Sequence, residues 1–319
     1  MTKALQALHD QYATLTAGRQ TRAAQFDPGE QGGSGRPVSC ATCGPAAPRG
    51  LYDVGSGLAL ARCKTCGLVF LARLANAASG RFYVDVADRL DPRAIREAFA
   101  RRVNPAMFER HRTVFESAFE EIFAMLNTAR PKIARLLDIG CGYGFFLAHV
   151  AARGVAVQGL EIDSEVAGYA RERFGLAVSE APIESFSAKT QFDGIVMCDV
   201  LQHLADPKSA IERCADLLVP GGILFLQVPN LVGFRLPTGH DWGLLHHIWQ
   251  FGPRTLSRLV EAGGLKPEAW STGVLDMVEI YERGGPTWLD RIIWAAARRL
   301  KLGNQLMMIA RKPDEAGPA

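Results

Sequence analysis

Glycine and acidic side chains gather where two apolar runs end, and their spacing could hold a ribose-bearing ligand. The first run contains Asp138 and is followed by Gly140, Gly142 and Gly144, after which helix-forming residues begin. Glycines at such a strand-to-helix bend adopt backbone angles that other residues avoid, and they let a ligand lie against the main chain. Glu161 ends the second run, 17 residues after Gly144. A carboxylate at that point can accept hydrogen bonds from both hydroxyls of a ribose.

Four of the seven cysteines form two C-x-x-C-G units, with 19 residues between Cys43 of the first and Cys63 of the second. Together Cys40, Cys43, Cys63 and Cys66 can give four thiolates at tetrahedral angles, and the glycine after each pair permits the tight turn that metal knuckles need. A redox C-x-x-C pair is the alternative. Two matched copies outside a thioredoxin-like context favour a structural zinc site, which is closed by four protein ligands and hence is not catalytic. A module this small lacks the core to fold without its metal.

The segments around these residues alternate between strand and helix patterns. Further strands are expected at 192–199, 223–228 and 305–310, and helices at 164–174 and 207–218. This alternation predicts an α/β fold built on a doubly wound sheet.

The glycine turn, the carboxylate after the second strand and the Pro-Gly-Gly turn at 220–222 resemble, motif by motif, the class I S-adenosylmethionine (SAM) dependent methyltransferases. An NAD-binding Rossmann turn would more usually place two residues before its last glycine, whereas the pattern here is G-x-G-x-G. The resemblance implies a Rossmann-like sheet of seven strands and SAM as the cofactor. Ordinary α/β scaffolding without a ligand is the alternative.

The resemblance also assigns roles to residues at the matching motif positions. Asp138 and the three glycines of the turn are expected to line the methionine end of SAM, and Glu161 is expected to bind the ribose hydroxyls. Cys198 and Asp199 are expected to close the crevice at the end of the fourth strand.

The cysteine units and the Phe82-Tyr83 pair that follows them are similar to the zinc ribbon and tyrosine-bearing connector that begin many bacterial methyltransferases acting on sugars, polysaccharides or secondary metabolites. This implies a small-molecule or glycan acceptor, methylated at a hydroxyl oxygen. The expected organisation is an N-terminal helix and linker at 1–37, the zinc ribbon at 38–72, a helical connector or cap at 73–130 with helices at 92–103 and 105–128, the SAM-binding domain at 131–312 with a substrate-facing insertion at 231–252, and a disordered tail at 313–319.

His203 is the leading candidate for a general base, because it follows Asp199 by four residues and an imidazole titrates near neutral pH. The alternative is a histidine that only orders the turn. His246 and His240 are second-line candidates. Some quinone-pathway methyltransferases bind magnesium through two acidic residues and a histidine at the positions of Asp199, Gln202 and His203. Residue 202 is a neutral glutamine here, which argues against a catalytic metal.

Charge and hydropathy limit the classes of partner that we expect for this protein. The 36 basic and 33 acidic residues leave a net charge of +3, and no basic stripe interleaved with aromatics is present, so no nucleic-acid partner is expected. No apolar stretch approaches the ~20 residues of a membrane span, and the N-terminus has no signal core. We therefore expect a cytoplasmic protein. The amphipathic, basic stretch 288–300 could lie on a membrane surface, but packing on the sheet or on a partner subunit is favoured; the oligomeric state stays open.

Two rival functions remain. An RNA methyltransferase could use the ribbon as a nucleic-acid module, but the balanced charge argues against it. Ribosomal RNA methyltransferases that begin with zinc cysteines also place Gly-His after the second unit, where this chain has Gly67-Leu68. A non-catalytic binding protein could keep the same fold, but the intact glycine and acidic motifs argue against that reading.

Overall fold

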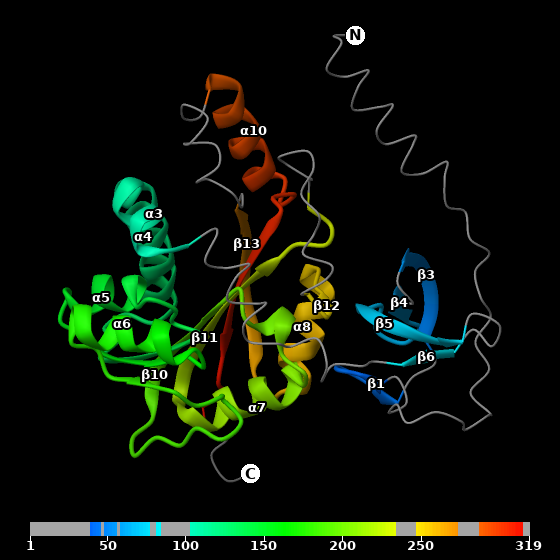
Figure 1. Ribbon diagram of the computed structural model, residues 1–319, viewed down its shortest axis with the longest axis horizontal. Coiled ribbons are helices and arrows are strands. Elements are labelled where there is room, and N and C mark those ends of the chain that lie inside the picture. Colours follow the sequence, from blue (N-terminus) through cyan, green and yellow to red (C-terminus); the bar gives the residue numbers. More distant parts are fainter. Residues whose placement is uncertain are drawn as a thin grey trace.

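The computed structural model describes residues 39–45, 48–55, 58–76, 81–83, 103–233, 247–273 and 287–314 (Figure 1). Several sequence-based expectations lie outside these residues. They are the N-terminal helix and linker, the first cap helix except for its last residue, most of the insertion at 231–252, and the tail beyond residue 314.

The large sheet has seven strands in the order β13-β14-β11-β10-β7-β8-β9. The strands from β11 to β9 are parallel to one another, and β14 runs antiparallel to β11 and β13. This is the seven-stranded, doubly wound sheet predicted from the sequence. Its strands are β7 (Arg135–Ile139), β8 (Ala156–Leu160), β9 (Val178–Ser179), β10 (Phe192–Cys198), β11 (Leu218–Pro229), β13 (Lys266–Gly273) and β14 (Gln305–Arg311).

Helices cover both faces of this sheet (Figure 1). Consecutive strand residues point to opposite faces, so Leu136 and Val196 pack in one buried cluster with residues of α4, α5 and α6. Leu137 and Ile195 pack in the other cluster with residues of α7 and α8. The helices are α4 (Arg112–Ala129), α5 (Phe145–Ala151), α6 (Ser164–Phe174), α7 (Pro207–Leu217) and α8 (Pro253–Ala262).

Two helices begin at the residues that the sequence predicts, because short-range caps fix their starts. The Asp163 side chain accepts hydrogen bonds from the N–H groups of Glu165 and Val166 at the start of α6. The Asp206 side chain accepts one from the Ser209 N–H at the start of α7, where Pro207 is the first helical residue. Such caps satisfy backbone donors that have no partner inside the helix.

The second cap helix, expected as one helix at 105–128, is two helices in the structure. α3 (Pro105–Arg110) ends and α4 begins at His111, whose φ of −119° and ψ of 29° are not helical. The break accompanies a tertiary contact, since the Phe108 ring of α3 stacks on the Phe145 ring of α5 with their centroids 4.0 Å apart. Residues of α4 cover one face of the sheet.

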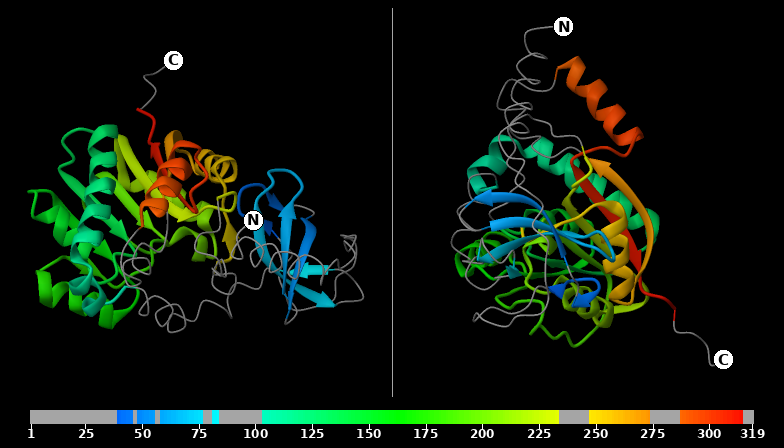
Figure 2. Two further views of the ribbon diagram at one scale, coloured as in Figure 1. Left: turned by 90° about the horizontal axis from the view of Figure 1, so that it is seen from above. Right: turned by 90° about the vertical axis from the view of Figure 1, so that its right-hand side faces the viewer.

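The second cysteine unit belongs to a second, smaller sheet, here called the N-terminal sheet, and the first unit belongs to a separate hairpin beside it. The N-terminal sheet lies beside the large sheet, next to α8 (Figure 2). Strand β12, which comes from the segment after β11, pairs antiparallel with β5 and completes this sheet. Its strands are β3 (Pro48–Gly55), β4 (Leu58–Cys63), β5 (Val69–Asn76), β6 (Arg81–Tyr83) and β12 (Trp249–Gln250), and a separate hairpin is made by β1 (Ser39–Cys40) and β2 (Gly44–Pro45).

Helix α10 (Trp288–Arg299) matches the amphipathic stretch in the sequence and packs beside β13 through the buried Ala297, whose carbonyl oxygen accepts a hydrogen bond from Thr272. Trp288 and Ile292 of the same helix are exposed. Within the described residues, every helix is too short or too polar to cross a bilayer.

Candidate active site and metal centre

The glycine turn lies between β7 and α5, as predicted. Gly140 has a φ of +73°, and a Cβ built there would lie 2.4 Å from Cγ2 of Val200. Gly142 has a φ of +54° and faces open space, because no atom lies within 4 Å of a Cβ built on it. Gly144 caps α5 and packs closely against Ala170 of α6. The turn is therefore closed on two sides and open over Gly142.

Glu161 follows β8 and is held against this turn by the main chain. Its Oε2 accepts a hydrogen bond from the Gly142 N–H at 3.0 Å, and its Oε1 accepts one from the Asp163 N–H at 2.9 Å. Burial raises the pKa of this carboxyl, although the two N–H donors act in the opposite direction and lower it. A carboxylate has about four acceptor sites, so acceptor capacity remains for two ribose hydroxyls.

Asp138 is buried at the end of β7, with 5% of its surface exposed. Burial, and then the nearby charge of Glu161, raise the pKa of its carboxyl to about 7. No lysine or arginine among the described residues forms an ion pair with either carboxylate. The pair is therefore a concentration of negative charge that a cationic ligand would relieve.

These features fit SAM, which carries a net positive charge and a ribose. The open space over Gly142 allows the ligand to approach the main chain closely. The two carboxylates suit the positive charge of SAM and the hydroxyls of its ribose. Asp138, the three glycines and Glu161 are thus brought to one end of the sheet, as the sequence predicted. Their contact with SAM is part of the proposal below.

Cys198 and Asp199 lie at the neighbouring strand end, where β10 stops. Asp199 has a positive φ of 55°, and its Oδ2 accepts a hydrogen bond from Gln227 Nε2 at 3.0 Å. Burial raises the pKa of the Cys198 thiol well above its usual value, so this side chain is neutral at the end of β10. Gln227 was not selected from the sequence. The signal that could have found it is its polar side chain inside the otherwise apolar run of β11.

His203 lies in the short helix η2 (Leu201–His203) that follows Asp199. It is 9% exposed, and its Nε2 lies 3.2 Å from the side-chain amide nitrogen of Gln202. Its ring packs edge-on against the ring of His247, with the centroids 4.8 Å apart. The side-chain amide oxygen of Gln202, Oε1, is buried without a hydrogen-bond partner in the described part of the chain. The other two histidine candidates, His246 and His240, lie outside the described residues.

The segment that includes β12 ties η2 to the N-terminal sheet. The Ile248 N–H donates to the Gln202 carbonyl at 2.9 Å, and the Ile248 carbonyl accepts from the Leu71 N–H at 2.7 Å. The indole N–H of Trp249 donates to the Leu204 carbonyl at 2.8 Å, and its ring lies 5.7 Å from that of Phe70. The turn that carries His203 is therefore bonded through one short strand to the cysteine-bearing sheet.

The four predicted zinc cysteines meet in space although two separate hairpins carry them. The sulfur atoms of Cys40, Cys43, Cys63 and Cys66 all lie within 4.8 Å of one another. In the part of the chain that the structure describes, this is the single group of three or more histidine, cysteine or acidic side chains close enough to share a metal.

Main-chain N–H groups stabilise the thiolate of one cysteine, Cys63, whereas burial raises the pKa of Cys40 and Cys43. Burial tends to raise the pKa of Cys63, but N–H donation from Cys66 and Thr65 outweighs it and lowers the pKa to about 7. The pKa of Cys43 is raised to about 11, first by burial and then by the neighbouring Cys66. Crowded sulfurs of this kind repel one another as thiolates, and a divalent cation removes that cost. The donor set and its spacing fit Zn²⁺.

Comparison with known proteins agrees with this geometry. The family model described as "Methyltransferase domain" matches residues 107–269, just over half of the chain. A Ubiquinone biosynthesis O-methyltransferase from Dinoroseobacter shibae is 33% identical over 167 residues, and the match covers 44% of this chain and 64% of that protein. One with the same name from Aromatoleum aromaticum is 36% identical over 184 residues, and the match covers 50% of this chain and 76% of that protein. The first match thus spans less than two thirds of its relative.

Among solved structures, a chain of the complex between the Haloferax volcanii Trm112 methyltransferase activator and a methyltransferase superposes with a TM-score of 0.51. The superposition covers 73% of this chain and all of that one, at 19% identity, so it reports on the fold alone. The sheet order, the glycine turn after β7 and the carboxylate after β8 define a Rossmann-like methyltransferase. The chain belongs to the class I SAM-dependent methyltransferases.

Proposed function

We propose that this protein transfers the methyl group of SAM to a hydroxyl oxygen of a small molecule, such as a sugar or a secondary metabolite. The observation that carries the proposal is the pair of buried carboxylates, Asp138 and Glu161, held at a glycine turn that is open over Gly142. The printed names of the curated relatives, O-methyltransferases, support oxygen as the methylated atom.

On the cofactor side, SAM when bound supplies a methyl group on a positively charged sulfur, which makes that methyl electrophilic. Glu161 accepts the ribose hydroxyls while the Gly142 and Asp163 N–H groups hold its carboxylate in place. Asp138 meets the positive charge of the ligand, and this charge favours the ionised form of a carboxyl whose pKa is otherwise about 7. Holding both reactants in line can contribute ~7–11 kcal/mol to catalysis.

On the acceptor side, His203 removes the hydroxyl proton. A well-placed base of this kind contributes a factor of ~10²–10⁴. The buried side-chain oxygen Oε1 of Gln202, which lacks a described partner, is suited to accept a hydrogen bond from an acceptor hydroxyl. Cys198 and Asp199 close the crevice between the two ligands.

The four clustered cysteines hold a structural zinc ion that closes the N-terminal sheet. This sheet supports the acceptor side of the site, because β12 bonds to β5 on one side and to η2 on the other. The rival reading of a free RNA-binding ribbon is weakened by the same contacts, since the β5 edge is already occupied by β12.

Calorimetry tests the cofactor site. Glu161→Ala is expected to weaken SAM binding by about 1–3 kcal/mol, because the ribose hydroxyls lose a charged acceptor. Glu172→Ala, at an exposed position on α6, is the matched control. Turnover is then measured on a panel of hydroxyl-bearing acceptors, with the methylated atom identified by NMR. Unchanged affinity in Glu161→Ala would place the pocket elsewhere, and methylation of nitrogen or carbon would overturn the choice of oxygen.

A further inference from the structure

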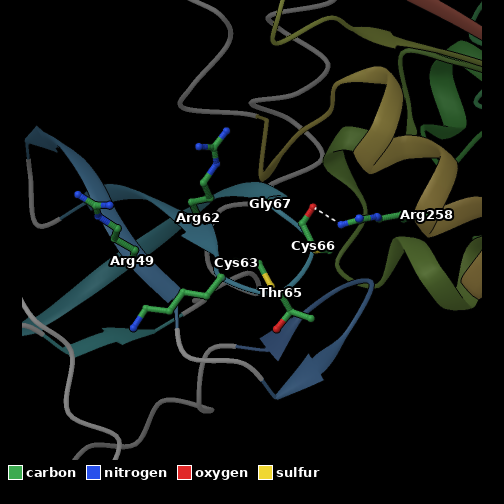
Figure 3. A pocket seen from close by; sticks show the side chains of 8 residues that line it. Arg49, Arg62, Cys63, Thr65, Cys66, Gly67 and Arg258 are labelled. Atoms are coloured by element: carbon green, nitrogen blue, oxygen red, sulfur yellow. Dashed lines mark hydrogen bonds between the residues drawn. The ribbon is translucent and has the colours of Figure 1, made fainter.

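A cavity of about 430 Å³ lies on the N-terminal sheet, where the second cysteine knuckle meets α8. Four of its eight lining residues are basic (Figure 3). The lining consists of Arg49, Arg62, Cys63, Lys64, Thr65, Cys66, Gly67 and Arg258. None of the eight is acidic.

The basic residues are held here by main-chain pairing. Arg49 of β3 and Arg62 of β4 are direct partners in the antiparallel register, and like charges directly opposite each other destabilise a sheet. Arg258 reaches across from α8 and donates through Nη1 to the Cys66 carbonyl at 3.0 Å (Figure 3). The arrangement brings positive charge from the N-terminal sheet and from α8 to the lining of one opening.

These charges have no protein counterions. Within the described residues, no carboxylate lies within 4.0 Å of the charged nitrogens of Arg49, Arg62, Lys64 or Arg258. The described carboxylates therefore leave the positive charge at this opening without a direct counterion.

The zinc site cannot balance all of this charge. A zinc ion bound by four thiolates carries a net charge of about −2, and two of the four basic side chains offset it. A surplus of about +2 remains. An anion with two negative charges completes the balance in the zinc-loaded protein.

We propose that this cavity binds a phosphate or diphosphate group. Arginine forks and a lysine are the side chains that bind phosphate oxygens most effectively, and the Thr65 hydroxyl adds a further donor at the rim. The site is separate from the SAM crevice and does not depend on the methyl-transfer proposal. An opening of about 430 Å³ suits one phosphate-bearing group better than a polynucleotide, which needs an extended basic track with stacking aromatics.

Titration calorimetry on the zinc-loaded full chain, with inorganic pyrophosphate as the probe, tests the proposal. The double variant Arg49→Gln/Arg62→Gln is expected to weaken binding about tenfold or more, since it removes two charge-assisted hydrogen-bonding groups. Arg291→Gln, an exposed arginine on α10, is the matched control and should bind as the wild type does. Lys64→Gln provides a single exposed change for the case that the double variant is poorly folded, and should weaken binding in the same direction.

Three further measurements separate the outcomes. Uridine diphosphate and vesicles containing phosphatidic acid distinguish a soluble phosphate group from a lipid headgroup, and either one binding supports the proposal. Absence of pyrophosphate binding, or equal binding by wild type and both cavity variants, would overturn it. A loss of zinc in the variants, together with no anion binding in the wild type, would also overturn the proposal. The arginines would then only stabilise the metal site. A short RNA binding far more tightly than pyrophosphate would also overturn the proposal in favour of nucleic acid.

Discussion

Replacement of Asp138 by asparagine should make the protein more stable at alkaline pH and less able to bind SAM. Asp138 is buried beside Glu161 with no described basic partner, and the pKa of its carboxyl is raised from 3.8 to about 7. Asparagine has nearly the same shape and cannot ionise. The substitution therefore removes a buried negative charge without leaving a cavity.

The size of the effect follows from the raised pKa. The shift from 3.8 to about 7 corresponds to about 4 kcal/mol against the ionised form. Between these values the folded chain keeps a proton that the unfolded chain has lost, so the free energy of unfolding falls as pH rises through this window and levels off above about pH 7. Roughly two thirds of the loss, about 3 kcal/mol, lies between about pH 5 and pH 8.

Urea denaturation of wild type and Asp138→Asn at pH 5 and pH 8, both zinc-loaded and without SAM, measures this loss. The variant should gain about 3 kcal/mol relative to wild type between the two pH values, because titrations elsewhere in the chain cancel in the comparison. SAM should bind the wild type more tightly as pH rises through about 7, since a cationic ligand favours the ionised carboxylate. The variant should bind weakly with little dependence on pH.

A constant difference in stability between the two proteins at pH 5 and pH 8 would refute the reasoning. It would mean that the Asp138 carboxyl is ionised in the folded chain at both pH values, and that a charge or a hydrogen-bond donor compensates it. Unchanged SAM affinity in the variant would separately remove Asp138 from the cofactor site.

Three other predictions concern the metal, the base and the strand that joins them. Chain purified without chelator should carry about one zinc, and Cys63→Ser should lose the metal together with the folded N-terminal sheet; metal analysis that finds no zinc in wild type would contradict this. His203→Ala should slow turnover by ~10²–10⁴ with SAM affinity unchanged, whereas His247→Ala should mainly change acceptor affinity, and a loss below tenfold at His203 would leave the reaction without a histidine base. Trp249→Phe keeps a ring beside Phe70 but leaves the Leu204 carbonyl without its indole donor, so it should lower the free energy of unfolding by about 1–3 kcal/mol. It should also lower turnover without changing SAM affinity. Unchanged turnover would show that the N-terminal sheet does not support the acceptor side.

Much of the large domain could be predicted because its signals are local. The caps at Asp163 and Asp206 set the starts of α6 and α7 within a few residues, and apolar runs marked the central strands. The glycine turn and Glu161 were placed by the same short-range logic. The cysteine units could also be predicted, because a metal knuckle is encoded in four consecutive positions and the second unit has the same pattern as the first.

The break at His111 was not predictable in this way. The composition of 105–128 favours one helix throughout, and the stacking of Phe108 on Phe145 joins residues far apart in the sequence. Likewise, the close approach of Gly140 to Val200 depends on two different strand ends meeting. Sequence patterns report which residues form an element, but not which side chains meet when elements pack.

The sequence by itself determined the order of strands and helices, the glycine turn, the acidic residue after the second strand and the paired cysteines, because each is specified by neighbours within a few positions. The tertiary structure decided the rest. Strand β12 has two residues, too few to show a period of two, and it exists because the β5 edge offers unpaired N–H and C=O groups. The pKa of Asp138 likewise depends on the burial that the whole sheet imposes and on the nearness of Glu161. Hydrogen-bond pairing at a sheet edge and the removal of water from a charge both require the folded chain, and for that reason neither can be read from local pattern.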